Sequence, residues 1–189
     1  MSRKPARNPR KATQKSLENA ALFYLQRYAS SAENLRRVLL RRVERSARAH
    51  DTDREEGAEF VENIIQRYRE AKLLDDGAYA AMRVATLRRR GASARAIRAN
   101  LMAKGVGSDD IDQALDADTA ETPNSELQAA CAYARRRRLG PWRSAEQRDE
   151  RRDRDLAALA RQGYSVDVAR QVINAETIAE LEAELEYQL

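Results

Sequence analysis

The side chains that most often perform chemistry in proteins are almost absent from this chain. Its 189 residues include a single histidine, His50, and a single cysteine, Cys131. A zinc site or a Cys–His catalytic pair needs several such residues close together, and these two are far apart in the sequence. We expect His50 to be solvent-exposed in a polar connector and Cys131 to be an inert core residue, as free cysteines usually are. A lone cysteine also excludes an intramolecular disulfide, which fits a reducing cytoplasm.

Paired acidic residues are the remaining candidates for metal or acid–base chemistry. Asp75–Asp76 and Asp109–Asp110 each stand where a helix is predicted to begin, and there the helix dipole favours negative charge without any metal. The sequence also contains no phosphate-binding glycine loop, no dinucleotide-binding motif and no nucleophile elbow. We therefore expect no catalytic set, no metal and no cofactor, and we do not expect an enzyme.

Clustered arginines are the residues that could serve a partner. In these clusters acids are sparse and arginine, whose planar fork suits phosphate or carboxylate, outnumbers lysine. Solvated helix faces, and cations that complement helix C-termini, are an equally good interpretation of the same pattern. The candidate partner- or DNA-binding residues are Arg36, Arg37, Arg41, Arg42, Arg88, Arg89, Arg90, Arg95, Arg98, Arg135, Arg136, Arg137 and Arg138.

Two neighbouring features carry weaker interpretations. Acids interleave with the arginines from Arg148 to Arg154, which favours a solvated face held by pairs along the helix. Trp142, which follows Pro141, is either a stacking group or, as we favour, a wedge between packed helical units.

The elements that would carry these residues are predicted to be helices throughout. Apolar residues recur at helical spacing in about ten segments, for example at Leu35, Leu39 and Val43. Capping signals such as Ser30 with Glu33 mark helix starts. These segments leave no room for a sheet, so the sequence predicts an all-α fold of amphipathic helices that must pack on one another.

A glycine turn recurs and divides the helices into units. Lys104–Gly105–Val106–Gly107–Ser108 and Gln162–Gly163–Tyr164–Ser165 each precede a helix whose apolar residues fall at the same offsets from the first glycine. Glycine is the expected residue just past a helix end, because it adopts positive φ without penalty. This predicts about three tandem three-helix repeats stacked into an elongated, curved molecule. The predicted parts are a disordered basic arm at 1–15, repeats at 16–74, 75–121 and 125–175, and an acidic helix at 176–189.

The formal net charge of +5 is unevenly distributed along the chain. Residues 1–17 contain lysines and arginines but no acidic residue, whereas the chain after Arg170 contains glutamates but no lysine or arginine. Such a dipolar chain suits a partner of mixed charge better than bare DNA. No apolar run approaches the roughly 20 residues of a membrane span, and none follows the basic start in the position of a signal peptide.

Several motifs, taken in order, resemble those of the RecX family. Residues 70–80, with Leu73–Leu74–Asp75–Asp76–Gly77 at their centre, are similar to the signature turn of that family. The run from Arg90–Gly91 through Ile97, Leu101 and Lys104–Gly105–Val106 to Ile111 and Leu115 is similar to its second repeat. Arg161–Gln162–Gly163–Tyr164–Ser165 resembles the end of its third. With Ala20–Leu25 and Ser31–Val43, the resemblance covers residues 17–175.

The resemblance implies a modular protein that regulates the recombinase RecA. Family members bind the RecA–single-stranded-DNA filament in its helical groove and inhibit filament growth, ATP hydrolysis and strand exchange without catalysis of their own. The expected partners are therefore RecA and the single-stranded DNA within its filament, in DNA repair, recombination and the SOS response. We expect a cytoplasmic monomer with no membrane partner. The chain departs from the family pattern in a charged insertion around Arg45–Glu56, in Ala78–Tyr79, where the family often has Phe, and in its acidic last helix.

The alternative is a helical module that binds nucleic acid directly through the basic arm and the arginine clusters. It predicts tight DNA binding without RecA and a steep fall of affinity with salt. The acidic C-terminal helix and a scarcity of exposed aromatic residues for base stacking weigh against it.

Overall fold

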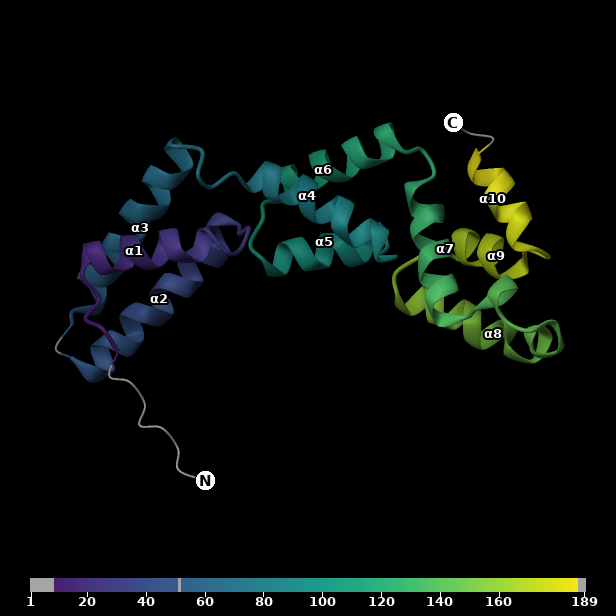
Figure 1. Cartoon of the computed structure of the whole chain (residues 1–189), viewed down its shortest axis with the longest axis horizontal. Coiled ribbons are helices and arrows are strands. Elements are labelled where there is room, and N and C mark those ends of the chain that lie inside the picture. The colour runs from purple at the N-terminus through teal and green to yellow at the C-terminus, as the bar shows by residue number, and fades with distance from the viewer. Residues whose placement is uncertain (1–8, 51, 187–189) are drawn as a thin grey trace, which may run out of the picture. The chain divides into compact units, whose positions relative to one another are not determined.

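The computed structural model describes residues 9–50 and 52–186, and in that part of the chain it is helical, with no strand (Figure 1). The helices are α1 (Gln14–Leu25), α2 (Ala32–Ala49), α3 (Arg54–Glu70), α4 (Asp76–Arg89), α5 (Ala94–Ala103), α6 (Ser108–Glu121), α7 (Ser125–Arg137), the short 3-10 helix η1 (Gly140–Trp142), α8 (Ala145–Arg161), α9 (Val166–Asn174) and α10 (Ile178–Glu186). The prediction of an all-α fold is confirmed.

These helices form two compact units. The first contains the described residues up to Tyr79, together with Lys104–Val106. The second contains Ala80–Ala103 and the described residues from Gly107 onward. The turn between α5 and α6 therefore belongs to the first unit, although it lies far along the chain from the helices α1 to α3.

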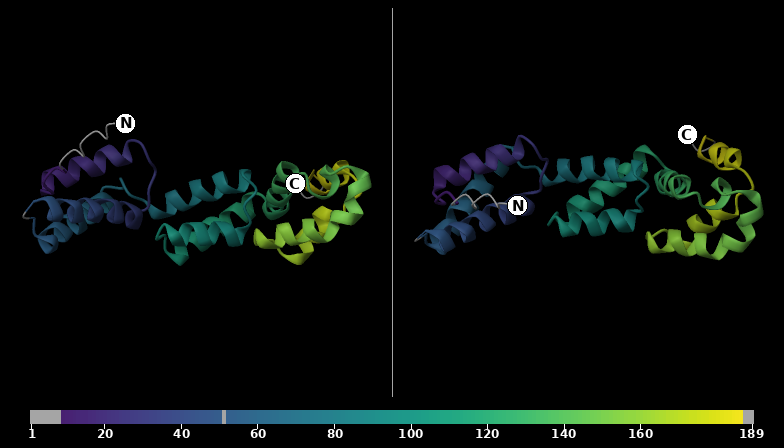
Figure 2. Two further views of the ribbon diagram at one scale, coloured as in Figure 1. Left: turned by 90° about the horizontal axis from the view of Figure 1, so that it is seen from below. Right: turned by 60° about the horizontal axis from the view of Figure 1, so that its bottom comes forward.

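The helices α1, α2 and α3 lie together (Figures 1 and 2). A core of buried side chains between them holds the first unit together. Leu17 of α1, Leu35 and Leu39 of α2, and Val61 and Ile64 of α3 are at most 1% exposed. Their spacing of three or four residues puts them on one face of each helix. Burial of each such side chain contributes about 1.5–3 kcal/mol, so this apolar contact is the main force that assembles the bundle.

The segment before α1 packs against α2. Ala12 is buried, and its N–H donates to the Ser46 hydroxyl of α2 at 2.8 Å. Thr13 then caps α1 by accepting from the Ser16 N–H. A buried backbone N–H needs such an acceptor, so the contact holds this segment against α2. Residues 1–8 of the predicted arm lie outside the described residues.

The charged stretch around Arg45–Glu56 mainly extends two helices. α2 runs through its first part, and Asp53 caps α3 by accepting from the Glu55 N–H at 2.8 Å. His50 between them is half-buried, and its Nε2–H donates to the Pro9 carbonyl at 2.6 Å. The prediction that His50 is solvent-exposed was wrong, because the chain before α1 folds back onto it.

The second unit contains two clusters of buried side chains. The α4, α5 and α6 helices bury one set of aliphatic residues, and α7, α8 and α9 bury another. The first set includes Val84, Ile97, Leu101 and Ile111, and the second includes Leu127, Ala130, Leu159 and Val172. The α10 helix (yellow in Figure 2) packs beside α7 through Leu181, which is 2% exposed.

Cys131 and Trp142 lie at the edge of the α7–α9 core, under α10. With Leu181 and Leu185 they line a cavity of about 500 Å³. Burial, with a smaller contribution from Glu184, raises the pKa of the Cys131 thiol to about 11, so the reactive thiolate is scarce at neutral pH. Trp142 packs on this core and faces α10, rather than standing as a wedge between two three-helix repeats.

The two predicted glycine turns have the predicted backbone conformation. Gly105 follows the end of α5 with φ of +74°, and Gly163 follows the end of α8 with φ of +90°. The next residues, Val106 and Tyr164, are each 5% exposed. Positive φ at glycine therefore reverses the chain and brings an apolar residue into the core at equivalent places.

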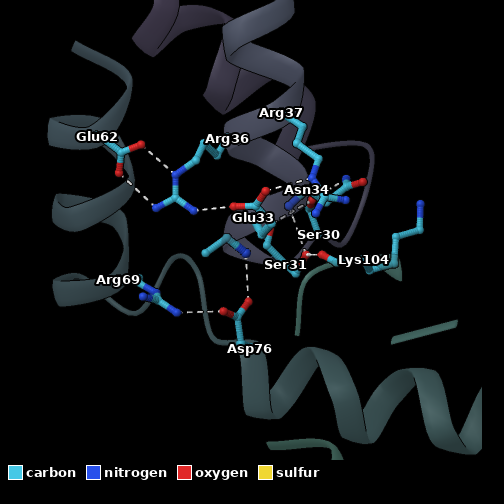
Figure 3. A network of polar contacts seen from close by, with 11 residues as sticks. Ser30, Ser31, Glu33, Asn34, Arg36, Arg37, Glu62, Arg69, Asp76 and Lys104 are labelled. Carbon is cyan, nitrogen blue, oxygen red and sulfur yellow. Dashed lines mark hydrogen bonds and ion pairs between the residues drawn. The ribbon is translucent and has the colours of Figure 1, made fainter. Parts of the chain in front are cut away.

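A serine at the start of α2 attaches that helix to the first of these turns (Figure 3). The Ser31 hydroxyl accepts from the Asn34 N–H at 3.2 Å, as a normal cap, and donates to the Lys104 carbonyl at 2.5 Å. The neighbouring Ala32 N–H donates to Asp76 at the start of α4 at 2.8 Å. We call this arrangement a serine joint.

The second unit contains the same serine joint at the equivalent turn. The Ser93 hydroxyl accepts from the Ala96 N–H at 3.1 Å and donates to the Gln162 carbonyl at 2.6 Å. The Ala94 N–H donates to Glu126 in the first turn of α7 at 3.0 Å. A helix cap and a long-range attachment thus share one hydroxyl group in both places.

Replacing Ser93 by alanine is expected to lower the free energy of unfolding by about 2 kcal/mol. About 1 kcal/mol comes from the lost cap and about 1 kcal/mol from the lost bond to the Gln162 carbonyl. Ser165→Ala is the matched control, since Ser165 caps α9 by accepting from the Val168 N–H at 3.2 Å, and it should cost about 1 kcal/mol. Denaturant titration measures both values, and equal losses would show that the Gln162 bond adds nothing.

Candidate partner-binding arginines

Two of the four arginines predicted as a binding cluster on α2 are engaged within the first unit. Arg36 donates from Nε and Nη2 to the two carboxylate oxygens of Glu62 on α3, at 2.7 and 2.9 Å, and from Nη1 to Glu33 at 2.5 Å. Arg37 donates to the other oxygen of Glu33 at 2.8 Å (Figure 3). The two-pronged contact with Glu62 fixes the Arg36 guanidinium between the two helices.

The pKa shifts in this group have the same origin. The hydrogen bond from Arg36, aided by Arg37 and opposed by burial, holds the pKa of Glu33 below its ordinary value. The hydrogen bond to Glu62 raises the pKa of Arg36 despite its partial burial. Arg41 and Arg42, by contrast, are exposed and form no salt bridge among the described residues. The candidate surface of α2 is therefore centred on Arg41 and Arg42.

Arg88, one of the candidate binding residues, is buried rather than part of an accessible surface. Its side chain is 9% exposed, donates from Nε to Asp118 of α6 at 2.8 Å, and donates from Nη1 to Glu126 of α7. Burial alone would lower the pKa of Arg88, but its hydrogen bonds with Glu126 and Asp118 raise it overall. Glu126 also holds the Ala94 N–H of the serine joint. Arg88 therefore connects α4, α6 and α7 in the second unit.

The other arginines of this predicted cluster differ in how freely they can meet a partner. Arg89, Arg90 and Arg95 are exposed, and none of them forms a salt bridge within residues 9–50 and 52–186. Arg98 pairs with Asp112 of α6, so its charge is partly neutralised. Three cations of this cluster remain available for an anionic partner.

The arginines at the end of α7 are all exposed. The last of them, Arg138, has a positive φ of +55° and ends the helix. Arg136 donates to the backbone carbonyl of Arg90 at 2.5 Å, and its guanidinium lies 5.6 Å from the centre of the Tyr133 ring. Two clusters that are separate in the sequence, one after α4 and one at the end of α7, thus meet in the second unit.

Two further arginines have structural roles near η1. Arg143 donates from Nη2 to the buried carboxylate of Asp155 at 2.9 Å, and Asp155 also accepts the Gly140 N–H at 3.0 Å. Arg148, predicted on a solvated face, is half-buried and donates to the Pro141 carbonyl at 2.8 Å. These contacts fold the turn between α7 and α8.

A basic groove in the first unit was not predicted from the sequence. It has a volume of about 560 Å³ between α1, the segment before it and α2, and Arg10, Lys15 and Arg42 line it. Phe23, which is 53% exposed, stands at its edge. One exposed aromatic side chain is therefore present beside cations in this groove.

The described surface offers positive charge and hydrogen-bond donors. Among the described residues, no three His, Cys, Asp or Glu side chains gather as a metal ion would need. In the same part of the chain, the helices are too short or too polar to cross a membrane. Exposed arginines can recognise phosphates or carboxylates by charge-assisted hydrogen bonds.

The helices, the glycine turns and the arginines define an all-helical protein with clusters of exposed positive charge. A family model described as RecX, second three-helix domain, matches residues 75–115. The regulatory protein RecX of Myxococcus xanthus is 45% identical over 170 residues, which are 89% of this chain and 90% of that protein. That of Agrobacterium fabrum is 31% identical over 84% of this chain and 82% of its own length. The chain belongs to the RecX family.

A solved structure agrees with this assignment. The crystal structure of a regulatory protein RecX is similar with a TM-score of 0.61 and 28% sequence identity, over 86% of this chain and 72% of that one. The family resemblance found in the sequence is thus confirmed.

Proposed function

We propose that this chain binds the filament that RecA forms on single-stranded DNA and inhibits the ATPase, recombinase and strand-exchange activities of RecA. The observation that carries the proposal is the 45% identity with the regulatory protein RecX of Myxococcus xanthus over 89% of the chain. We further propose that it acts by occupying surface rather than by catalysis. In this role it would work as a cytoplasmic monomer in DNA repair, recombination and the SOS response.

The charge of the second unit supports this proposal. Arg89, Arg90 and Arg95 are exposed and unpaired among the described residues, and exposed arginines at the end of α7 lie beside Arg90. A nucleoprotein filament presents carboxylates of the protein and phosphates of the DNA, and both accept the forked hydrogen bonds of arginine. Electrostatic attraction would also speed association at low salt.

A titration of RecA ATPase activity tests the proposal. The full chain is added at or below the stoichiometry of RecA, with single-stranded DNA and ATP present, and ATP hydrolysis and strand exchange are followed. Both rates should fall as the chain is added. Unchanged rates at equimolar amounts would contradict the proposed function.

The double variant Arg89→Ala/Arg90→Ala is expected to inhibit less well, with half-inhibition at a concentration about tenfold higher. Two lost charge contacts of roughly 0.7 kcal/mol each produce that factor. The helical CD spectrum should not change, because both side chains are exposed. Arg154→Ala/Arg170→Ala, at two other exposed positions of the second unit, is the charge-matched control. Equal inhibition by the two double variants would remove Arg89 and Arg90 from the interface.

Direct binding of nucleic acid is the second candidate function. The basic groove of the first unit favours it, since three of its lining residues are cations and an aromatic side chain stands beside them.

A further inference from the structure

We propose that the groove between α1 and α2 in the first unit is a direct binding site for single-stranded nucleic acid. Its phosphates would lie against Arg10, Lys15 and Arg42, and a base would stack at Phe23. The inference rests on the second candidate function, direct binding of nucleic acid, and adds the site and the single-stranded form of the ligand. It is tested without any recombinase.

All the charged residues that line the groove, among the described residues, are cations. Arg10 comes from the segment before α1, Lys15 from the first turn of α1, and Arg42 from α2. The described residues that line the groove include no carboxylate. The fold brings these cations together from three segments, and Arg10 keeps its place because the segment around it is held by the bond from the Ala12 N–H to Ser46.

These cations lack the partners that neighbouring arginines have. Within the described residues, Arg10, Lys15 and Arg42 form no salt bridge, whereas Arg36, Arg48 and others in this unit pair with glutamates. Like charges held around one groove repel one another, and this repulsion disfavours the empty site. A bound polyanion would attract the three cations and so offset their mutual repulsion. It would also release its own condensed counterions, which favours binding.

One face of α1 continues the groove as a regular stripe. Lys15, Asn19 and Phe23 follow one another at intervals of four residues within α1, so they lie on the same side of the helix, and Arg27 comes four residues later in the turn just after α1. From Lys15 to Phe23 the helical part of the stripe is about 12 Å long, since each helical residue rises about 1.5 Å. The stripe thus offers a cation, an amide, an aromatic ring and a second cation in line, over the length of a few nucleotides.

Phe23 and Arg27 form the part of the stripe that suits a base. The Arg27 guanidinium carbon lies 3.7 Å from the centre of the Phe23 ring, and 53% of the Phe23 surface is exposed. A guanidinium stacked on a ring keeps its in-plane N–H groups available for phosphate. An aromatic ring beside cations is the combination by which proteins hold single strands without sequence preference.

The aromatic ring distinguishes a single strand from other polyanions. An acidic peptide could neutralise the three cations, but its aspartate and glutamate side chains would gain little from Phe23. In a duplex the base faces are already stacked, so Phe23 could reach only the edges and the backbone. A single strand is the polyanion that uses the charges and the ring together.

The test measures binding of the full chain to a fluorescein-labelled oligothymidylate of about 20 nucleotides, by anisotropy at several salt concentrations and without RecA. Three variants are compared with the unmodified chain. Lys15→Gln/Arg42→Gln removes two groove charges, Phe23→Leu removes only the ring, and Arg154→Gln/Arg170→Gln removes two exposed charges from the second unit. CD spectra and thermal melting check that each variant is folded.

The two groove variants should change different quantities: the charge variant should change the salt dependence of binding, and the ring variant only the affinity. Lys15→Gln/Arg42→Gln should reduce the slope of log affinity against log salt by about 1.4, since each phosphate contact to a single strand contributes about 0.7. Phe23→Leu should weaken binding about tenfold and leave the slope unchanged. The control Arg154→Gln/Arg170→Gln should keep the original slope.

Several results would overturn the proposal. The first is a salt slope that falls no further in Lys15→Gln/Arg42→Gln than in the control. A second is an oligoglutamate peptide that displaces the oligothymidylate at equal charge while Phe23→Leu binds normally, which would indicate a site for acidic protein. A third is a duplex that binds as tightly as the single strand and is unaffected by Phe23→Leu. Inhibition of RecA is not part of this assay, so either proposal can fail alone.

Discussion

Replacing Arg88 by methionine is expected to lower the free energy of unfolding by about 3–5 kcal/mol. The substitution keeps an unbranched apolar stem but removes the guanidinium that donates to Asp118 and Glu126. Two carboxylates would then face a site that is 9% exposed at Arg88, with no cation to compensate them. Guanidinium denaturation, followed by helical CD, measures the loss.

Arg89→Met is the matched control for this prediction. It removes the same charge from the next position of α4, where the side chain is exposed, and should change stability by no more than about 0.5 kcal/mol. A small loss in Arg88→Met as well would mean that the contacts with Asp118 and Glu126 carry little free energy. The contrast also matters for function, because weaker RecA inhibition by an Arg88 variant would report unfolding rather than a lost contact.

Replacing Gly91 by alanine is expected to cost about 3 kcal/mol or more. Gly91 ends the turn after α4 with φ of +72°. This left-handed conformation is about 1–2 kcal/mol less favourable for alanine than for glycine. A Cβ atom there would also lie 2.6 Å from the backbone nitrogen of Tyr133 and 2.8 Å from the carbonyl oxygen of Ala129, both on α7. These are backbone atoms, which cannot change rotamer as a side chain can. The turn after α4 must therefore move away from α7, and this movement disturbs the packing of α4 against α7. Denaturant midpoints measure the effect.

The control for Gly91→Ala is Gly107→Ala. Gly107 has a negative φ of −65°, and the nearest atom to an added Cβ would be a carboxylate oxygen of Asp110 at 3.9 Å. This substitution should lower stability by no more than about 1 kcal/mol, because Gly107 is the N-cap of α6 and alanine is less favourable than glycine there. Similar losses in the two variants would show that α4 and α7 do not approach as closely in solution as in the structure.

Local patterns predicted the helices and the glycine turns well. Gly105 and Gly163 were identified from the residues around them, because the positive φ that follows a helix is a local requirement. The cap of α2 is Ser31 rather than the predicted Ser30, since two adjacent serines present the same side chain and the packing of the helix decides between them.

The role of each arginine could not be predicted from its neighbours in the sequence. Arg88 stands in a run of three arginines, but its partners are 30 and 38 residues away, in other helices. Only the packing of α4, α6 and α7 turns this arginine inward and the next one outward. The second role of Ser93 was hidden for the same reason, because the cap is local and the Gln162 carbonyl is not.

The groove of the first unit was only partly visible in the sequence. The interval of four residues from Lys15 through Asn19 to Phe23, with Arg27 four residues further on, is visible in the sequence, and its first three members could have been recognised as an exposed face of α1. Arg10 and Arg42 are added to it by the packing of α2 and of the segment before α1. The arrangement of these cations around one space is therefore a property of the fold.

The serine joints impose an order of events during synthesis of the chain. The Ser31 hydroxyl can bond to the Lys104 carbonyl only after 73 more residues have been synthesised. The Ser93 hydroxyl needs the Gln162 carbonyl, which is 69 residues further on. At about 5–20 residues per second on the ribosome, each of these hydroxyl groups lacks its distant acceptor for about 4–15 seconds. The start of α2 can therefore be completed before that of α5, and α5 stays open at its start until the turn at Gly163 has emerged. A nascent chain that ends before this turn could form the bond from Ser31 to Lys104 in the first unit, but it could not form the bond from Ser93 to Gln162 in the second.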